Sequence, residues 1–567
     1  MENPAKPDPN RLLSVRDLSV GFPVRKQTID VVQSVSFDLS RGETLCMVGE
    51  SGSGKSVTAR AVMRIEKPGI ITGGSILLHG PDGTADDLAK IDVKGPKMRS
   101  IRGGRIGLVF QEPMSSLSPV HTIGQQIVET IQLHRDVPAA EARRDAIEAL
   151  RRVQIPSPET ALDQYSFEFS GGMRQRAMIA MALSCEPDIL IADEPTTALD
   201  VTTQAEILRL VKHLQDSLGM GVIFITHDLG VVAEVADRVA VMFRGKLVET
   251  GPVRKLFHHA KTRYARHLIG ASAKFSIVGD HARGGTLPAP TAKPLLEVDG
   301  LDLTFRKRTG LIFRKTREFH ALKNVSFTLH EGENLGIVGE SGSGKTTLVR
   351  ALVGLLKADA GRAVYRSKDG REFDLLKDNA LRSAGLNREI RMVFQDPFSS
   401  LNPRMTVEQV IAEPLTLEKR LSPAEIRDRV AQLLERVGLP TNVMSRYPHA
   451  FSGGQRQRIS IARAIAVEPR VIIADEATSA LDGSIRSQIL DLLFDLQSEL
   501  GVSYLFVGHD LGVVRYFCDR IAVMHHGELV ELGSAATVCQ TPEKDYTRRL
   551  IAAVPATDPD RRRLLSA

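Results

Sequence analysis

The chain has 567 residues, more than one hydrophobic core usually serves, so we expect at least two domains. Hydrophobic residues make up 42% and charged residues 25%, which is ordinary for a soluble globular protein. A net charge of +6 over this length is too mild to indicate a nucleic-acid-binding protein, although weak affinity for an anionic membrane surface is compatible with it. No run approaches the roughly 20 apolar residues needed to span a bilayer, so any membrane-crossing partner must be another chain.

The N-terminus, MENPAKPDPN, has no apolar segment of the kind found in signal peptides, so we expect none. The cysteines are Cys46, Cys185, Cys518 and Cys539, and none are spaced as C-x-x-C. Such sparse cysteine usage suits a reducing cytosol, and no Cys/His cluster predicts a metal site.

The first predicted strand, GETLCMVG, runs into the pattern G-x-x-x-x-G-K-[ST] at Gly49–Ser56 and then into a helix, SVTARAVM. Glycines in such a loop allow backbone N–H groups to point inward and form an anion site at a helix N-terminus. We expect Lys55 to neutralise the β- and γ-phosphates and Ser56 to ligate Mg²⁺.

Further along, the apolar run ILIADE ends in Asp193 and Glu194. Two carboxylates at the end of a buried strand are costly unless a cation lies beside them. Because it follows a phosphate loop in the sequence, this pattern predicts that Asp193 holds Mg²⁺ through water and that Glu194 polarises the attacking water. A helix follows at QAEILRLVKHLQDSL, which has helical apolar spacing. Alternating strands and helices indicate an α/β sheet.

The whole pattern then returns at an offset of about 280 to 290 residues. IVGESGSGKTT provides Lys345 and Thr346, and VIIADE ends in Asp475 and Glu476. A stretch rich in Gly, Ala and Pro, HARGGTLPAPTAKP, separates the copies. We therefore expect one domain at 1–270, a linker at 271–294 and a second domain at 295–567.

With the motifs FSGGMRQR and FSGGQRQR between each VFQ and each acidic strand, nearly the whole chain resembles the ATP-binding cassette (ABC) family. The resemblance implies two tandem P-loop NTPase domains, each with a helical subdomain and an N-terminal antiparallel β subdomain. It also implies ATP hydrolysis with ATP and Mg²⁺ bound. In this family two cassettes pack head to tail, and the signature serine and glycines of one complete the ATP pocket of the other.

The same resemblance implies the roles of single residues. Glu194, Glu476 and the switch histidines His227 and His509 would be catalytic. Nucleotide would be bound by Phe22, Gly49, Ser51, Gly52, Ser53, Gly54, Lys55, Ser56, Val57, Gln111, Asp193, Ser170, Gly171, Gly172, Phe305, Gly339, Ser341, Gly342, Ser343, Gly344, Lys345, Thr346, Thr347, Gln395, Asp475, Ser452, Gly453 and Gly454. Mg²⁺ would be held by Ser56, Gln111, Asp193, Thr346, Gln395 and Asp475. Asp200 and Asp482 would lie in the loops that communicate between the pockets. No catalytic position is missing from either half, which predicts two active sites.

Three features resemble the dipeptide, oligopeptide and nickel importer branch: VFQEPMSSLSP with VFQDPFSSLNP, ADEPTTALDVTTQ, and the segments KTRYARHLIGA and KDYTRRLIAAVP. The branch implies two separate transmembrane permease subunits and an extracytoplasmic solute-binding protein as partners. It places the chain peripherally on the cytoplasmic face of a bacterial inner membrane, importing peptide-like solutes. The cysteine positions predict no iron–sulfur cluster.

Several alternatives stay open at this point. A soluble twin-cassette ATPase acting on ribosomes or DNA is the competing class, although the linker is short and poor in charge. Glu168 in FEFSGGM is replaced by Ala450 in HAFSGGQ, which favours unequal coupling of the two halves to the membrane subunits. The basic stretch Arg306–Arg317 predicts either a solvated hairpin or a contact with acidic lipid headgroups or a membrane partner.

Overall fold

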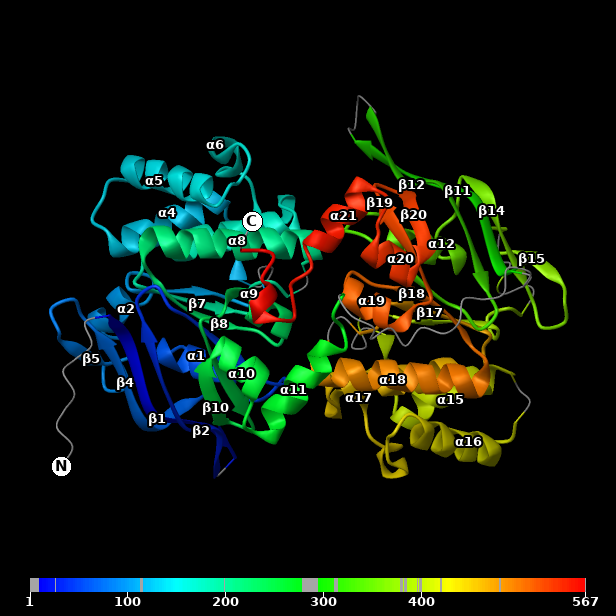
Figure 1. Ribbon diagram of the computed structural model, residues 1–567, viewed down its shortest axis with the longest axis horizontal. Coiled ribbons are helices and arrows are strands. Elements are labelled where there is room, and N and C mark those ends of the chain that lie inside the picture. The colour runs from blue at the N-terminus through cyan, green and yellow to red at the C-terminus, as the bar shows by residue number, and fades with distance from the viewer. Residues whose placement is uncertain are drawn as a thin grey trace. The chain divides into compact units, whose positions relative to one another are not determined.

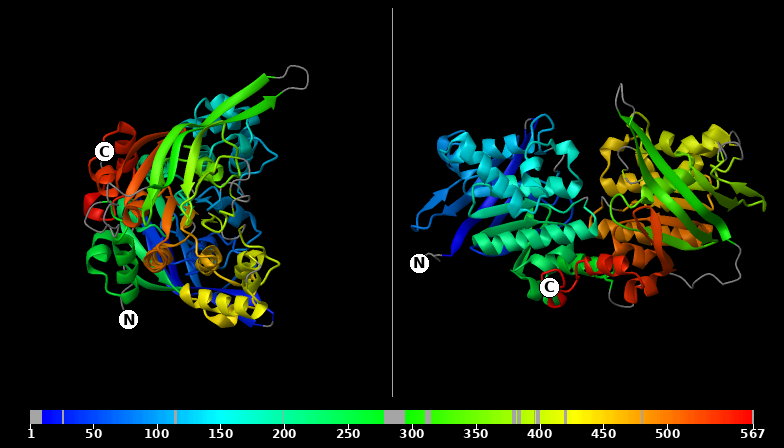
Figure 2. Two further views of the ribbon diagram at one scale, coloured as in Figure 1. Left: turned by 90° about the vertical axis from the view of Figure 1, so that its right-hand side faces the viewer. Right: turned by 90° about the horizontal axis from the view of Figure 1, so that it is seen from above.

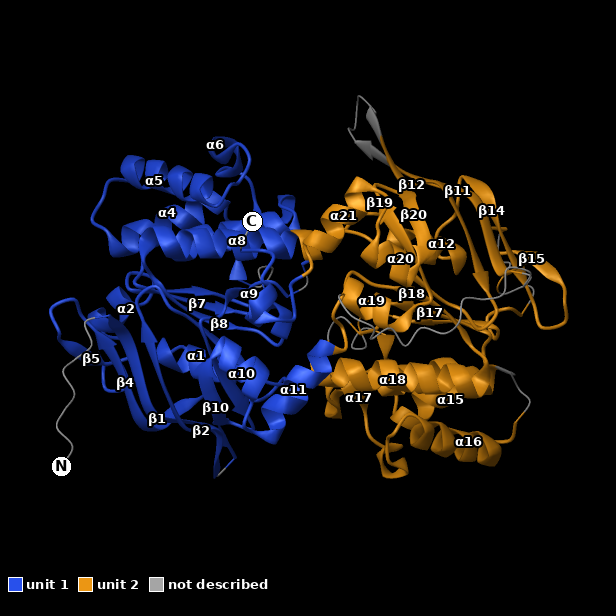
Figure 3. Ribbon diagram, in the orientation of Figure 1, with its two compact units in different colours: residues 1–199, 203–273, 555–567 blue, residues 200–202, 274–554 orange. Residues whose placement is uncertain are grey.

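The chain is described by a computed structural model that covers residues 10–565, with gaps at 26, 113–115, 198, 278–293, 310–314, 378–380, 382–384, 395, 397–399, 419–420 and 479–480; side chains are also left out at 307–317 and 418. Figure 1 shows the course of the chain. It divides into two compact units, coloured separately in Figure 3. Unit 1 comprises residues 1–199, 203–273 and 555–567, and unit 2 comprises 200–202 and 274–554.

Unit 1 contains two sheets. The first is four-stranded and antiparallel, in the order β2 (Gln27–Ser40), β1 (Arg11–Val24), β4 (Ile70–His79), β5 (Ala85–Asp87). The second is six-stranded, in the order β10 (Lys246–Pro252), β9 (Arg238–Phe243), β3 (Thr44–Val48), β8 (Gly221–Ile225), β7 (Ile189–Asp193), β6 (Ile106–Val109). Its strands are parallel except β10, which pairs antiparallel with β9.

The helices of unit 1 are α1 (Lys55–Val62), α2 (Pro96–Ile101), α4 (Ile123–His134), α5 (Ala139–Arg152), α6 (Pro158–Ala161), α7 (Gly171–Leu183), α8 (Val201–Leu218), α9 (Leu229–Val235), α10 (Val253–His259) and α11 (Arg263–Ala273), with short 3₁₀ turns η1 (Ser166–Glu168) and η4 (Pro559–Arg561). Helices α4, α5 and α6 lie together beside the mixed sheet (Figure 1), and α7 packs on α4 and α5 as well as on β6 of that sheet. These helices form the helical subdomain that the family resemblance implies for this cassette.

Unit 2 repeats this plan. Its antiparallel sheet has the order β12 (Lys315–His330), β11 (Pro294–Thr309), β14 (Ala360–Arg366), β15 (Glu372–Asp374). Its six-stranded sheet has the order β16 (Ile390–Val393), β17 (Val471–Asp475), β18 (Ser503–Val507), β13 (Asn334–Val338), β19 (Arg520–His525), β20 (Glu528–Ser534). The paired strands β11 and β12 extend well past the rest of their sheet (Figure 2).

The helices of unit 2 are α12 (Lys345–Leu352), α15 (Val407–Glu418), α16 (Pro423–Arg436), α17 (Gly453–Ile465), α18 (Gly483–Leu500), α19 (Leu511–Phe517), α20 (Ala535–Gln540) and α21 (Asp545–Ala552), with 3₁₀ turns η2 (Thr441–Val443) and η3 (Pro448–Ala450). The described part of the chain contains no helix that is both long enough and apolar enough to cross a membrane.

The central strands of each mixed sheet are buried over their full length. All five residues of β3, β7 and β8 are buried, as are all five of β13, β17 and β18. Continuous apolar runs such as ILIAD and VIIAD produce this pattern, because a parallel sheet is covered on both faces. The rigid sheet therefore fixes the loops at the carboxyl ends of β3 and β7, which carry the functional motifs.

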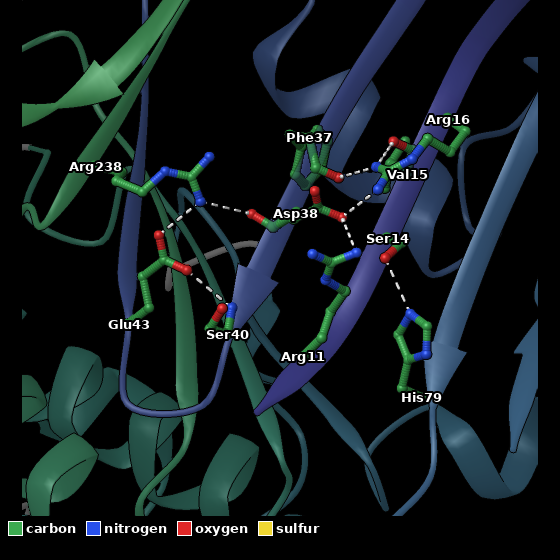
Figure 4. A network of polar contacts seen from close by, with 10 residues as sticks. All are labelled: Arg11, Ser14, Val15, Arg16, Phe37, Asp38, Ser40, Glu43, His79 and Arg238. Atoms are coloured by element: carbon green, nitrogen blue, oxygen red, sulfur yellow. Dashed lines mark hydrogen bonds and ion pairs between the residues drawn. The ribbon is translucent and has the colours of Figure 1, made fainter. Parts of the chain in front are cut away.

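A polar network lies at the N-terminal end of β3, opposite the end that carries the phosphate loop (Figure 4). Glu43, just before β3, accepts hydrogen bonds from the Ser40 backbone at 2.8 Å and from Arg238 at 2.8 Å. Asp38 on β2 pairs with Arg16 on β1 at 2.7 Å. The bonds of Glu43 join the two sheets of unit 1 away from the phosphate-loop end of β3, and the Asp38–Arg16 pair ties β2 to β1 within one sheet.

Candidate functional site

The loop between β3 and α1 folds around its own lysine. The Lys55 Nζ donates to the carbonyl oxygens of Gly49 at 2.7 Å and Glu50 at 2.9 Å. In unit 2 the Lys345 Nζ donates to Gly339 O at 2.7 Å and Glu340 O at 2.8 Å. Both lysines are only 5% exposed, so each ammonium is held inside its loop.

Two glycines in each loop are required by the backbone. Gly54 and Gly344 precede their helices with φ of 98° and 106°, in the left-handed region. A Cβ on Gly49 would lie 2.3 Å from the Met242 carbonyl oxygen, and one on Gly339 would lie 2.2 Å from that of Met524. The loop glycines therefore permit a close approach that no other residue allows.

The acidic strands β7 and β17 end beside these loops. The Ser56 hydroxyl donates to Asp193 Oδ1 at 2.7 Å, and Arg60 lies 3.4 Å from Oδ2. Burial raises the pKa of Asp193, although Ser56 and Arg60 partly oppose this. In unit 2, burial and the neighbouring Glu476 raise the pKa of Asp475 to about 6. Its buried Oδ1 has no hydrogen-bond partner among the described residues, although Arg350 and Lys345 act on the carboxylate electrostatically.

Glu194 follows β7 and is the centre of a second polar cluster. Its carboxylate accepts from Gln111 Nε2 at 2.9 Å and Thr197 Oγ1 at 2.9 Å, and its Oε1 lies 3.3 Å from His227 Nδ1. Burial would raise the pKa of Glu194, but His227, Thr197 and Lys55 together lower it to about 2. The carboxylate is therefore ionised across the physiological range.

The corresponding glutamate of unit 2 is arranged in the same way. Glu476 Oε2 lies 3.4 Å from His509 Nδ1, and His509 with Lys345 lowers the pKa of Glu476 against the effect of burial. Glu194 and Glu476 have φ of 48° and 47°, in the left-handed region that non-glycine residues seldom adopt. Backbone strain of this kind gathers at functional sites, and it occurs here at the same position in both units. Gln395 lies outside the described residues.

The two signature motifs form helix N-termini. Ser170 Oγ accepts from the Met173 backbone at 3.3 Å, and Ser452 Oγ accepts from the Gln455 backbone at 3.4 Å. Ser170 and Ser452 are exposed, as is Gly171, whereas Gly454 is buried. A Cβ on Gly172 would lie 2.6 Å from Thr203 Cγ2, and one on Gly454 would lie 2.5 Å from Ile485 Cγ2. The second glycine of each signature thus lets α7 pack on α8, and α17 on α18.

The remaining predicted residues lie on the surrounding elements. Phe22, on β1, is half-buried beside Gly69, whereas Phe305, on β11, is 42% exposed. Val57 and Thr347 lie in the first turns of α1 and α12. Asp482 caps α18 by accepting from the Ile485 backbone at 3.0 Å.

Sequence reasoning missed a pair of tyrosines at the phosphate loops. The Tyr264 hydroxyl on α11 accepts from the Glu50 backbone N–H at 3.0 Å, and the Tyr546 hydroxyl on α21 accepts from that of Glu340 at 3.2 Å. Both lie in segments quoted above only as markers of the importer branch. Their common place in KTRYARHLI and KDYTRRLI, after a duplicated domain, was the available signal.

Comparison with protein families agrees with this geometry. The model described as ABC transporter matches residues 32–197 and 322–479, which include both phosphate loops and both acidic strands. The chain belongs to the ABC transporter family. A second model, described as oligopeptide/dipeptide transporter, C-terminal region, matches residues 530–567.

Curated relatives in this ABC family match almost end to end. The glutathione import ATP-binding protein GsiA of Shigella flexneri is 48% identical over 98% of this chain and 91% of its own length. The protein of the same name from Escherichia coli K12 has the same identity and coverage. Among solved structures, cbiO1 from Clostridium perfringens is 31% identical, covers 44% of this chain and 92% of its own, and has a TM-score of 0.37.

The predicted fold class is confirmed: each unit is an α/β cassette with a helical subdomain and an antiparallel β subdomain. The chain is an ABC-type ATPase that binds ATP. The competing prediction, a soluble twin cassette for ribosomes or DNA, receives no support from these relatives.

Proposed function

We propose that this chain powers an importer of peptide-like solutes. The observation that carries the proposal is the 48% identity, over 98% of the chain, to ATP-binding proteins named for glutathione import. The match of residues 530–567 to an oligopeptide/dipeptide transporter region supports the same substrate class. Two separate transmembrane permease subunits would form the pathway, and an extracytoplasmic protein would deliver the solute. The chain would then lie peripherally on the cytoplasmic face of a bacterial inner membrane.

In each cassette, ATP is held by the phosphate loop. Lys55 and Lys345 turn their ammonium groups from the loop carbonyls to the β- and γ-phosphates, and the loop N–H groups surround the same oxygens. The remaining nucleotide-binding residues predicted from the sequence keep those roles, with Phe22 and Phe305 against the adenine. The two cassette domains would span 1–270 and 295–567, joined by a linker at 271–294.

The residues present fit a divalent cation beside the phosphates. In unit 1 the Asp193 carboxylate is paired with the Ser56 hydroxyl at the start of α1, and in unit 2 the buried Asp475 Oδ1 lacks a hydrogen-bond partner among the described residues. Oxygen ligands of this kind suit Mg²⁺. The expected ligands are Ser56, Gln111 and Asp193 in one cassette and Thr346, Gln395 and Asp475 in the other. The ion, when bound, would neutralise charge on the β- and γ-phosphate oxygens.

Hydrolysis depends on Glu194 and Glu476. Each is ionised and has a strained backbone conformation, and each can accept a hydrogen bond from the attacking water and orient it toward the γ-phosphate. His227 and His509 lie against these carboxylates and would contact the γ-phosphate. Each histidine thereby links the state of the nucleotide to the helix that follows it.

In this proposal, each cassette completes the ATP pocket of the other. Ser452, Gly453 and Gly454 would close the pocket that contains Lys55, and Ser170, Gly171 and Gly172 would close the pocket that contains Lys345. The exposed N-terminus of each signature helix supplies N–H donors and a partial positive charge suited to the γ-phosphate. Two ATP molecules would draw the cassettes together, and hydrolysis would release them.

The membrane-facing features stay predictions. Glu168 is exposed and accepts from the Tyr165 backbone at 2.8 Å, whereas Ala450 offers no such acceptor in unit 2. This difference supports unequal contacts with two different permease loops. Most of the basic stretch Arg306–Arg317 lies outside the described side chains.

The proposal is tested by tagging the chain in its native host, solubilising the membranes gently and identifying what copurifies. We expect two polytopic membrane proteins, with a capture protein encoded by the same transport system. Ribosomal proteins, or recovery of the chain without any membrane protein, would overturn the transport function and leave the ATPase assignment intact.

A further inference from the structure

The chain exchanges short segments between its two units. After α11 of unit 1, residues Lys274–Ile277 belong to unit 2; after α21 of unit 2, residues from Pro555 onward belong to unit 1 (Figure 3). We call Lys274–Ile277 the linker arm and Pro555–Leu565 the C-terminal strap. ATP binding within a single cassette requires neither segment.

The strap is captured by a buried carboxylate. Glu234 on α9 is 0% exposed and accepts from the backbone N–H groups of Ala556 at 2.9 Å, Arg563 at 3.0 Å and Leu564 at 3.1 Å. A carboxylate removed from water must be compensated in this way, and here all these donors come from the strap. Glu234 is therefore a specific receptor for the strap backbone.

The strap in turn is bonded to the C-terminal end of α9 and passes close to its start. Arg562 donates to the carbonyl oxygens of Ala233 at 3.0 Å and Ala236 at 2.6 Å, where the helix ends. Near the helix start, a Cβ on Gly230 would lie 3.2 Å from the Pro555 Cβ, so the strap passes close over this turn. Leu564 is fully buried, and its carbonyl accepts from Arg209 Nε at 2.9 Å.

Helix α9 follows directly after the switch histidine. Asp228, the residue after His227, caps the helix by accepting from the backbone of Gly230 at 2.8 Å. His227 itself lies 3.3 Å from Glu194. A displacement of α9 would therefore move His227 relative to the glutamate that orients water.

Unit 2 holds its equivalent helix in the same place with different side chains. Arg515 on α19 donates to the carbonyl oxygens of Ser276, at 3.0 Å, and Ile277, both in the linker arm. A Cβ on Gly512 would lie 2.1 Å from the Phe275 carbonyl oxygen, so only glycine admits the arm. Tyr516 stands where unit 1 has Glu234. The same docking is thus achieved by a cation in one unit and a carboxylate in the other.

Both crossing segments begin at a helix that touches a phosphate loop. Tyr546, whose hydroxyl accepts from Glu340, lies on α21, and the chain runs from there into the strap. Tyr264 occupies the same place on α11, ahead of the linker arm. Each phosphate loop is therefore hydrogen-bonded to a helix whose covalent continuation docks on the switch helix of the other cassette.

We propose that Glu234 is a positioning residue for ATP hydrolysis: by capturing the C-terminal strap it fixes α9 and so holds His227 against Glu194. Because the strap is a direct continuation of α21, this places the switch of the first cassette under the control of the second. The inference rests on the proposed role of His227 in hydrolysis.

The test compares Glu234→Gln with the matched control Glu43→Gln in the full-length chain. Glutamine at 234 turns one acceptor oxygen into a donor facing strap N–H groups, whereas Glu43 accepts a backbone N–H at the far end of β3. We expect Glu234→Gln to lower kcat for ATP hydrolysis roughly 3- to 30-fold, because in the proposed cycle ATP left in the first pocket keeps the cassettes together and so limits both pockets. The ATP dissociation constant should change by less than about twofold. Glu43→Gln should change neither. A wild-type kcat for Glu234→Gln overturns the proposal.

A second comparison separates positioning from loss of folding. In a His227→Ala background, Glu234→Gln should cause no further loss of hydrolysis, because both changes act on one step. An additional loss of the same size there would show that Glu234 acts elsewhere, and would overturn the proposal. Arg562→Met, which removes the strap's bonds to the α9 carbonyls, should reproduce the kcat effect. If His227→Ala alone hydrolyses ATP at the wild-type rate, the switch role fails, and it fails independently of the strap.

Discussion

At the scale of single residues, the sites are defined by carboxylates whose pKa values are pushed apart. Asp475 has a pKa raised to about 6 by burial and by Glu476, whereas the pKa of Glu476 is lowered by His509 and Lys345. Adjacent acids with opposite shifts suit opposite tasks. Asp475, whose pKa is raised, is suited to bind a cation, whereas Glu476, whose pKa is lowered, stays ionised and can orient water.

The role of the glutamates is tested by Glu194→Gln and Glu476→Gln, made singly. Glutamine keeps the shape but is a far weaker hydrogen-bond acceptor for water, so we expect hydrolysis in the altered pocket to slow by roughly 100-fold or more. Because unhydrolysed ATP in one pocket would keep the cassettes together in the proposed cycle, total turnover should fall to a similar extent in each variant. ATP should still bind, because neither residue belongs to the phosphate loop. Steady-state hydrolysis together with a fluorescent ATP analogue measures both quantities. Wild-type hydrolysis in either variant refutes that residue as the base.

The raised pKa of Asp475 makes a prediction about stability and pH. Its folded pKa of about 6 lies above the unfolded value of 3.8, so the folded chain takes up a proton between these values. The free energy of unfolding therefore falls as pH rises through this window, by at most about 3 kcal/mol. Asp475→Asn removes this cost. In EDTA, the variant should gain more thermal stability over the wild type at pH 7.5 than at pH 4.5; an equal gain at both pH values contradicts the assignment.

At the scale of elements, much of each cassette could be predicted because its motifs sit at fixed element ends. The phosphate loops fall between β3 and α1 and between β13 and α12, and ILIADE and VIIADE form β7 and β17 as expected. Local patterns of this kind depend on neighbours in the chain. The contacts of Tyr264, Tyr546 and Glu234 could not be predicted in this way, because their partners lie far along the sequence. For the two tyrosines, the repeated place after each domain was a signal, but it did not identify the partner.

The packing of α17 on α18 predicts different behaviour for the two signature glycines. A Cβ on Gly454 would lie 2.5 Å from Ile485 Cγ2, whereas one on Gly453 would have its nearest neighbour, Leu481 Cδ2, at 3.9 Å. Gly454→Ala should therefore destabilise the ATP-free protein by about 1–3 kcal/mol. Gly453→Ala should leave its thermal unfolding unchanged or slightly raised, since alanine favours a helix. Adding Ile485→Ala should relieve the first variant, and equal stability of the two alanine variants would contradict this packing.

The contact of α21 with the phosphate loop predicts an effect on affinity. Tyr546→Phe leaves the Glu340 backbone N–H without its acceptor, so the loop should lose part of its fixed geometry. In a Lys55→Ala background, we expect ATP to bind about fivefold more weakly to the second cassette. Tyr365→Phe, which removes a hydroxyl bonded to Glu389 on the same unit, is the matched control. Equal affinities for the two variants would mean that the Tyr546 hydroxyl does not shape the loop.

At the scale of the whole molecule, duplication is the feature that the sequence reveals most directly. Equivalent residues recur in the same order, and the structure gives each unit the same sheets and the same strained glutamate. The docking of the strap and the linker arm could not be predicted from the sequence, because neither segment carries a motif that indicates the surface on which it packs. The proposed pairing of each phosphate loop with the other cassette's signature rests on the family resemblance.

The most direct test of this pairing counts occluded ATP in the Glu194→Gln/Glu476→Gln protein, where two molecules per chain are expected. Adding Lys55→Ala should leave one, and so should adding Ser452→Arg. Combining Lys55→Ala with Ser452→Arg should still leave one, because both damage the same pocket, whereas Lys55→Ala with Ser170→Arg should leave none. The reverse result, with none in the first combination and one in the second, would show that each cassette completes its own pocket and would contradict the account.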